Sequence, residues 1–140
     1  MFHGLYDIIM IKKSPLVKAL MQVLSEYKAN THNLEMRNCA ICNLYRKYYG
    51  YDCGNCPFAQ VFHRCGSRMC APVNCKVHAS TKRSKAYNQR LLAVQEFYVK
   101  VLSRVRRMTV SELNTRGAFD FMIKIDQEVS QKYNLERYRR

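Results

Sequence analysis

Residues 39–57 have the sequence CAICNLYRKYYGYDCGNCP, in which two C-x2-C pairs are separated by ten residues. Cys39 and Cys42 form the first pair, and Cys53 and Cys56 form the second. This spacing is typical of a tetrahedral zinc site with four thiolate ligands, where each pair forms a tight turn that directs two sulfurs at one ion. Pro57 is expected to stop the second turn. The stretch therefore predicts a zinc-knuckle-like module.

Further metal ligands follow closely along the chain. Five lie within sixteen residues: His63, Cys65, Cys70, Cys75 and His78. These five residues could form a second four-ligand metal site, or they could share ligands with the first two pairs in a cross-brace. The alternative is that the cysteines are ordinary buried thiols and the histidines lie on the surface. Residues 39–78 are short and polar, so we expect metal binding to supply much of their folding energy, and chelation to unfold them.

All seven cysteines lie between Cys39 and Cys75. The first ten residues, MFHGLYDIIM, lack the basic start and small-residue cleavage site of a secretory signal, so we expect a reducing compartment, where thiols bind metals rather than form disulfides. An iron–sulfur cluster is the rival cofactor, because Cys-Pro also ends some ferredoxin motifs, although the spacing differs. Whether Met1 or Met10 starts the chain stays open.

The flanking segments have helical periodicity. Ser14 and Pro15 predict an N-cap and first turn for a helix to about residue 29. A second helix is expected from Ser80-Thr81 to about Met108. The capping-box pattern Thr109-x-x-Glu112 predicts the start of a third helix. Gly117 predicts a break, followed by a last helix that ends near residue 133. A 140-residue chain of this kind predicts a single, mainly α domain with helical parts at 1–36 and 80–140 and the Cys-rich module at 37–79 between them.

The charge is strongly basic and unevenly distributed. The chain has 24 Lys and Arg against 10 Asp and Glu, a formal net charge of +14. Fourteen of the basic residues but only two of the acidic ones, Asp52 and Glu96, lie in residues 37–107. Such an excess favours a partner that carries phosphates or carboxylates. On the helix after the cysteines, Lys100, Arg104 and the Arg106-Arg107 pair continue a basic face.

Tyrosines interleave with these cations between the two Cys pairs. Tyr45, Tyr48, Tyr49 and Tyr51 alternate with Arg46 and Lys47, a pattern that suits a single strand with bases stacked on rings and phosphates on cations. The alternative is that some of these rings pack the module onto the helices. The predicted nucleic-acid-binding residues are Arg46, Lys47, Tyr48, Arg64, Arg68, Lys82, Arg83, Lys85 and Arg90.

The motifs C-A-I-C-N-L-Y, C-G-N-C-P-F and C-G-S-R-M-C resemble small cysteine-rich proteins of tailed phages. The resemblance covers about residues 39–70 and implies a phage origin and a bound metal at the four matching cysteines. It carries no activity, and the chain shows no catalytic motif, so we expect a non-enzyme. No apolar run is long enough to span a membrane. The expected location is the host cytoplasm or the virion.

The sequence thus predicts a small, zinc-binding, nucleic-acid-binding protein. It would act directly or as an accessory factor on a transcription or replication complex. One alternative is a virion or host-takeover protein whose basic face binds an acidic protein surface. The other is an iron–sulfur redox protein. DNA and RNA are not distinguished at this stage.

Overall fold

Helices make up all the regular structure that can be described. The computed structural model describes residues 10–31, 39–49, 56–64 and 85–135. The helices are α2 (Lys13–Ala29), α3 (Ala40–Tyr49), α4 (Pro57–Arg64), α5 (Lys85–Arg107), α6 (Val110–Leu113) and α7 (Phe121–Lys132). The prediction of a mainly α fold is confirmed. Within the described ranges, none of these helices combines the length and apolar character that a membrane-spanning helix requires.

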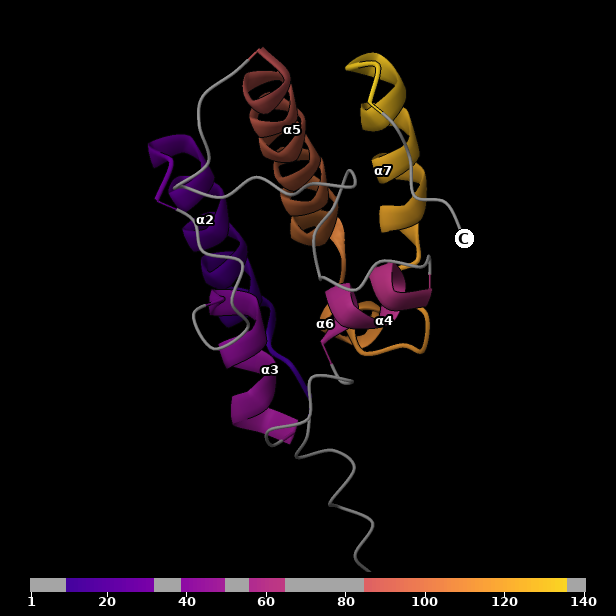
Figure 1. The fold of residues 1–140 in the computed structure, drawn as a ribbon. Helices are drawn as coiled ribbons and strands as arrows, with labels where there is room; N and C mark the ends of the chain where they lie inside the picture. The colour runs from indigo at the N-terminus through magenta and orange to yellow at the C-terminus, as the bar shows by residue number, and fades with distance from the viewer. Residues whose placement is uncertain (1–9, 32–38, 50–55, 65–84, 136–140) are drawn as a thin grey trace, which may run out of the picture.

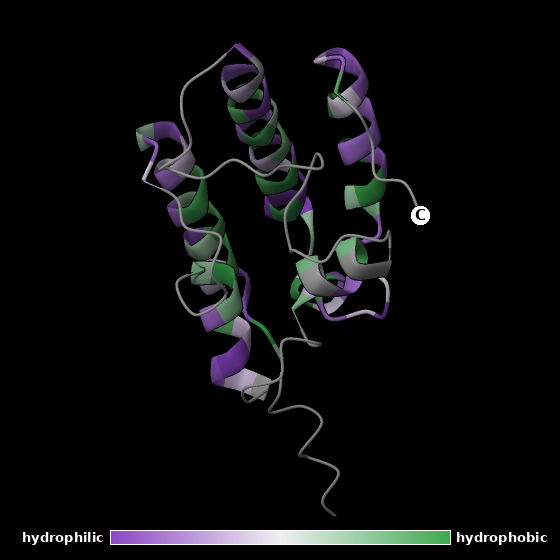
Figure 2. Cartoon of the chain, in the orientation of Figure 1, coloured by the Kyte–Doolittle hydropathy of each residue, from purple (hydrophilic) through white to green (hydrophobic). Residues whose placement is uncertain are grey.

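The longest helix, α5, lies between α2 and α7 (Figure 1). Hydrogen bonds fix α2 antiparallel to α5: the Tyr87 hydroxyl bonds to the Asn30 side chain at one end, and Lys13 donates to the main-chain carbonyl of Arg106 at the other. Helix α3 packs against α2, and α4 packs against α7 and the aromatic residues of α5. Figure 2 shows the hydrophobic sides of these helices turned towards one another.

Helix α2 follows from its apolar periodicity, but it begins earlier than expected. Leu16, Leu20 and Tyr27 are buried as one stripe. The N-cap residue is Lys12, in an extended conformation, with no side-chain cap, so the prediction of Ser14 as N-cap was wrong. The first-turn N–H groups of a helix have no intrahelical partner, so Pro15 is tolerated at the third helical position and the helix can start before it.

The centre of the core is an aromatic cluster that joins α4 to α5. Phe97 is fully buried, and its ring centroid lies 5.8 Å from that of Phe62 and 6.2 Å from that of Phe58. Tyr98 stacks on Phe58 at 5.6 Å and on Tyr27 of α2 at 5.5 Å. Aromatic residues bury the largest apolar areas of any side chains, so this cluster ties three helices together.

The turn from α5 to α7 matches the sequence prediction. Thr109 accepts a hydrogen bond from the Glu112 N–H at 3.1 Å, and the Glu112 carboxylate accepts one from the Thr109 N–H at 2.7 Å. This confirms the predicted capping box. Gly117 has φ +76°, a left-handed conformation that favours glycine, and it separates α6 from α7 as expected.

The Cys-rich segment differs most from its prediction. The described residues of the loop expected between the two Cys pairs form helix α3. Pro57 begins helix α4 and does not end the second Cys turn as expected. Proline suits this first helical position because its missing N–H would have no partner there. Ile41, Phe58 and Val61 are at most 2% exposed and belong to the main core, so the expectation that this segment is too polar to be held by burial was wrong for its described part.

Candidate metal centre and basic surface

Two of the predicted ligands stand at the starts of two helices. The Cys39 carbonyl accepts the first helical hydrogen bond of α3 from the Asn43 N–H at 2.9 Å. The Cys56 carbonyl does the same for α4 with the Gln60 N–H at 3.0 Å. Both cysteines therefore occupy N-cap positions, where the helix dipole favours a negatively charged group such as a thiolate.

Cys42 brings the first pair close to the second. Its Sγ lies 4.0 Å from Sγ of Cys56, and both side chains are buried. Cys39, Cys42 and Cys56 are thiols that form no disulfide. A tetrahedral site with Zn–S bonds of about 2.3 Å holds its sulfurs about 3.8 Å apart. The Cys42–Cys56 distance therefore fits two ligands of one ion.

Cys39 is coupled to Cys42 within the first turn of α3. A side-chain hydrogen bond with Cys42 raises the pKa of the Cys39 thiol, and burial raises it further. Main-chain hydrogen bonds from Cys42 and Ile41 act in the opposite direction on this pKa. The net effect raises the pKa and favours the neutral thiol, so Cys39 would have to lose its proton to bind a metal.

The remaining predicted ligands are not placed. Cys53, Cys65, Cys70, Cys75 and His78 lie outside the described residues, and for His63 only its position in α4 is known. Taken alone, the described residues contain no group of three or more His, Cys, Asp or Glu side chains arranged to hold a metal ion. Cys42 and Cys56 are brought together, but the three described cysteines do not form such a group, so a four-thiolate site at this point requires both a closer approach of Cys39 and the addition of Cys53.

The structure separates the predicted nucleic-acid-binding residues. Arg46, Lys47 and Tyr48 lie in the second half of α3, whereas Lys85 and Arg90 lie in the first turns of α5. Figure 1 shows these two segments towards opposite ends of the molecule. Arg64 is in α4, with its side chain outside the described set, and Arg68, Lys82 and Arg83 lie outside it altogether.

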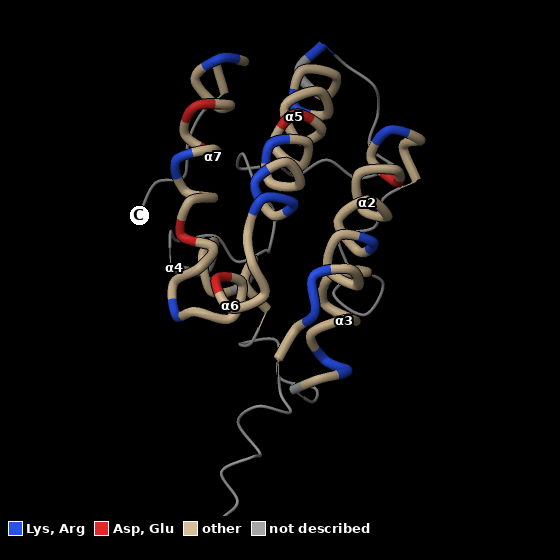
Figure 3. Tube along the Cα trace, turned by 180° about the vertical axis from the view of Figure 1, so that it is seen from behind, with Lys and Arg blue, Asp and Glu red and all other residues tan. Residues whose placement is uncertain are grey.

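A second group of cations forms where the last turns of α5 meet the first turns of α2. We call it the α2–α5 basic surface; it consists of Lys12, Lys13, Lys18, Lys100, Arg104, Arg106 and Arg107. Lys13 is half-buried and the other six are exposed. Figure 3 shows basic residues along both helices on this side of the molecule. Sequence analysis missed the α2 members, because residues 1–36 are nearly neutral and only the tertiary fold brings them to α5.

These cations are mostly without acidic partners. The Arg106 guanidinium lies 3.5 Å from the Met21 sulfur, and Arg107 donates to the Ser103 hydroxyl at 3.2 Å. The Arg104 guanidinium lies 4.7 Å from the centre of the Phe121 ring. Lys100 lies 4.0 Å from Glu96, which is already paired with Lys132 at 2.8 Å. Within the described residues, none of the three arginines forms an ion pair.

Of the four tyrosines expected to stack on bases, the two whose side chains are described pack against the core. Tyr45 is 7% exposed and belongs to the hydrophobic core, and Tyr48 is half-buried against it. This agrees with the alternative interpretation, in which the rings hold the Cys-rich segment on the helices. The Tyr49 side chain and all of Tyr51 lie outside the described residues.

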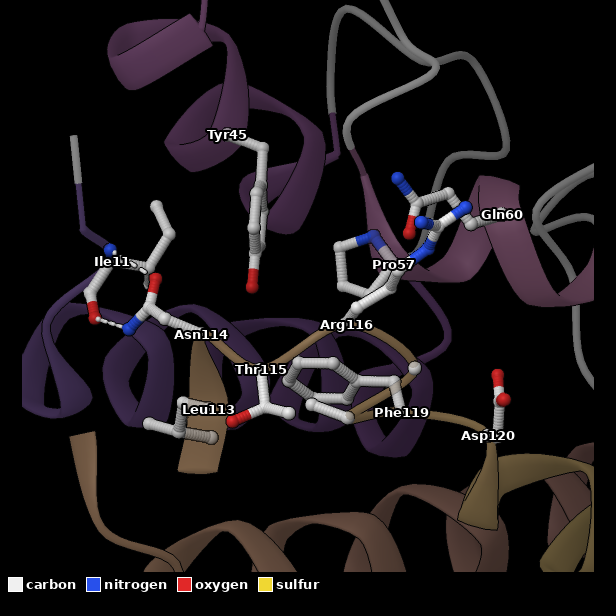
Figure 4. Close-up of a pocket in the computed structure, with 12 residues that line it drawn as sticks. Ile11, Tyr45, Pro57, Gln60, Leu113, Asn114, Thr115, Arg116, Phe119 and Asp120 are labelled. Carbon is white, nitrogen blue, oxygen red and sulfur yellow. Dashed lines mark hydrogen bonds between the residues drawn. The ribbon is translucent and has the colours of Figure 1, made fainter. Parts of the chain in front are cut away.

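A pocket of about 240 Å³ lies where α3, α4 and the segment after α6 meet (Figure 4). Tyr45, Pro57 and Phe119 line it. Its Asn114 amide is occupied, because it accepts from the Ile11 N–H at 2.9 Å and donates to the Ile11 carbonyl at 3.0 Å. The volume is below the range of about 300–1,000 Å³ typical of ligand sites. We therefore regard the pocket as a feature of packing.

Comparison with known proteins identifies no relative: no family model, no curated protein and no solved structure matches the chain.

Proposed function

We propose that this chain is a small zinc-stabilised protein that binds nucleic acid through the α2–α5 basic surface. Binding, and not catalysis, is the function proposed. One observation carries it: Arg104, Arg106 and Arg107 are exposed and form no ion pair within the described residues. Arg106 is bonded to Lys13 of α2, while Glu112, near Arg104 and Lys13, is a single carboxylate against this group of cations. Clustered cations of this kind repel one another unless a polyanion neutralises them.

A purely structural role explains only part of this surface. Arg104, Arg106 and Arg107 lie in the last turn of α5, where cations interact favourably with the negative end of the helix dipole. That interaction does not extend to Lys12 and Lys18. These two lysines lie towards the N-terminal end of α2, and they add to the repulsion among the cations. Lys13 does cap the end of α5, because it donates to the Arg106 carbonyl, so only Lys12 and Lys18 favour an external anion over a helix-capping role.

The proposed zinc ion is held by Cys39, Cys42, Cys53 and Cys56. The 4.0 Å separation of the Cys42 and Cys56 sulfurs supports it, as do the N-cap positions of Cys39 and Cys56. A metal here would join the start of α3 to the start of α4, and thus hold the aromatic residues of α4 against α5. Its role is structural, because four protein ligands leave no open coordination position.

The nucleic-acid proposal is tested by fluorescence anisotropy of a labelled nucleic acid over a series of salt concentrations. We expect the affinity to fall steeply with salt, and the double variant Lys100→Gln/Arg107→Gln to weaken binding about tenfold or more at low salt and to reduce the salt slope by about two. The charge-matched control is Lys28→Gln/Lys124→Gln, two exposed lysines outside the basic surface. Thermal unfolding of both variants checks that the fold is retained.

Two results would contradict the proposal. One is the absence of binding at every salt concentration. The other is an equal loss of affinity in the test and control variants, which would show that net charge alone matters and that the α2–α5 basic surface is not the site.

The second candidate function is binding to an acidic protein surface. Leu92 is 53% exposed and Val99 is 47% exposed, and they lie seven residues apart on the same face of α5 as some of the cations. Exposed apolar residues beside cations are more typical of a protein interface than of a phosphate-binding one. A stoichiometric acidic partner whose binding is lost in Leu92→Ser and weakened in Lys100→Gln/Arg107→Gln, without any binding of nucleic acid, would favour this candidate.

The resemblance to tailed-phage proteins belongs to the same proposal. It suggests a transcription or replication complex of an infected cell as the setting for the nucleic-acid function, and a virion or host-takeover complex for the protein-binding one. An iron–sulfur cluster remains the rival to zinc. Iron in elemental analysis, together with visible absorbance, would replace zinc with that cluster.

A further inference from the structure

We infer, on the basis of the proposed function, that the nucleic acid is double-stranded and is held by its phosphate backbone without contacts to the bases. The inference rests on the shape of the helix layer around α5, on the covering of the aromatic rings and on the placement of the cations in two rows.

The first argument is the shape of the surface. Helix α5 is packed against α2 on one side and α7 on the other (Figure 3), so it has a neighbouring helix on each side. Packed helices lie about 8–10 Å apart, whereas the major groove of B-DNA is about 12 Å wide and admits one unflanked helix. Helix α5 therefore cannot enter a groove while its neighbours stay in place. The exposed side chains of α5 contact the phosphate backbone of the nucleic acid at the edges of the groove.

The second argument concerns the aromatic rings. Binding of a single strand without sequence preference depends on bases stacked on exposed rings. Of the aromatic side chains that the structure describes, none is exposed. The ring of Phe121, beside the basic surface, is covered by the Arg104 guanidinium at 4.7 Å. The basic surface therefore offers charge and hydrogen-bond donors, which suit phosphates, and lacks stacking platforms within the described part.

The third argument is that the cations lie on both sides of α5. Arg106 contacts α2 through Met21 and Lys13, so it extends the row of α2 lysines. Arg104 contacts α7 through Phe121, and Lys100 lies beside Glu96, which is bonded to Lys132 of α7. Cations on opposite sides of one helix are about a helix diameter apart, roughly 10–12 Å, which is comparable to the width of a groove bordered by two phosphate backbones. A single strand has only one such backbone.

The test compares duplex and single-stranded probes at the same series of salt concentrations. The probes are a labelled duplex of about 30 base pairs, each of its strands alone, and a second duplex of unrelated sequence. We expect both duplexes to bind equally within about twofold, and at least about tenfold more tightly than either strand. Lys12→Gln/Lys18→Gln from the row on the α2 side and Lys100→Gln/Arg104→Gln from the row on the α7 side should each weaken duplex binding, whereas Lys28→Gln/Lys124→Gln should not.

The outcomes distinguish the two proposals. A single strand that binds as tightly as the duplex overturns this inference and leaves the proposed function in place. So does a strong preference for one duplex sequence, because that requires contacts to base edges. A loss of duplex affinity in only one of the two row variants also overturns the inference and leaves the proposed function in place. If no probe binds at any salt concentration, both the inference and the proposed function fail.

Discussion

The Sγ atoms of Cys42 and Cys56 lie 4.0 Å apart, although fourteen positions separate these residues in the sequence. One belongs to the first turn of α3 and the other caps the start of α4. Both are buried beside hydrophobic residues of the core, so the proposed metal centre is continuous with the packed interior. A metal there would reinforce an interface that apolar burial already forms.

The first prediction is therefore that Cys42→Ser removes zinc without unfolding the whole chain. We expect about one zinc ion fewer per chain by elemental analysis, since a missing thiolate leaves three of the four ligands. Because Ile41 and Phe58 stay buried, helical circular dichroism should largely survive, and the midpoint of thermal unfolding should fall. Treatment of the wild type with a chelator should likewise remove zinc and lower the midpoint of thermal unfolding while most of the helical signal is kept.

Cys65→Ser is the matched control for this site. Loss of zinc in Cys42→Ser alone identifies a single centre at the first two Cys pairs. Loss of a further ion in Cys65→Ser would show a second centre among the downstream cysteines and histidines. A wild-type zinc content in Cys42→Ser would eliminate the proposed ligand set.

The aromatic cluster supplies the second prediction. Phe97→Ala removes a fully buried ring that lies between Phe58, Phe62 and Tyr98. We expect the free energy of unfolding to fall by about 3–5 kcal/mol, as for other buried Phe→Ala changes that leave a cavity. Urea denaturation measures it. Leu92→Ala on the exposed face of the same helix should change stability by less than about 0.5 kcal/mol; an equal loss in both variants would contradict the core assignment.

Apolar periodicity was sufficient to predict the long helices. The stripe that includes Leu16 and Tyr27 and the stripe that includes Phe97 are buried as expected, because each helix must cover one apolar face. Met21 and Leu92 stand at the edges of these apolar stripes, and both are exposed. Periodicity gives the phase of a helix only to within a residue or so, so positions at the edge of a stripe are decided by which neighbouring helix covers them.

The Cys-rich segment was predicted less well for a different reason. The spacing of Cys39 and Cys42 indicated a metal-binding turn, and this local signal outweighed the weaker helical pattern of Ile41 and Tyr45 behind it. Burial of these residues depends on contact with α2, which no local pattern reveals. The α2–α5 basic surface is likewise a product of tertiary structure, since Lys13 and Arg106 are far apart in the chain and meet only after folding.

The third prediction concerns Asn114, which joins the residue before α2 to the end of α6. Its amide NH2 donates to the Ile11 carbonyl at 3.0 Å and to the Val110 carbonyl at 2.8 Å. Asn114→Asp keeps the shape but replaces the donor with an acceptor facing two carbonyls. We expect a loss of about 1–3 kcal/mol in urea denaturation. Asn88→Asp, an exposed position on α5, is the control and should have little effect; comparable losses would show that added charge is the cause.

The fourth prediction tests the capping box that starts α6. Thr109→Ala removes the hydroxyl that accepts from the Glu112 N–H at 3.1 Å. Loss of such a cap costs about 1 kcal/mol, which thermal or urea unfolding detects. Ser111→Ala, one position inside the same turn and exposed, should be nearly neutral. Equal effects of the two changes would mean that the cap contributes little here.

The fifth prediction is a pH dependence at Glu96, whose carboxylate links α5 to α7. It accepts hydrogen bonds from Lys132 at 2.8 Å and from the Tyr133 hydroxyl at 2.9 Å. The hydrogen bond from Lys132 holds the pKa of Glu96 below its ordinary value of 4.5. A lowered folded-state pKa means that the contribution to stability is complete above pH 4.5 and is lost as the pH falls through the folded-state pKa.

Glu96→Gln should therefore destabilise the protein at pH 7 by no more than about 1 kcal/mol, the range for a largely exposed ion pair. The difference from wild type should shrink towards zero in urea denaturation as the pH falls below 4.5 and the wild-type carboxylate becomes protonated. Glu128→Gln, an exposed carboxylate on α7, should show no such convergence. A wild-type advantage that is unchanged at acidic pH would mean that Glu96 acts through packing and not through its charge.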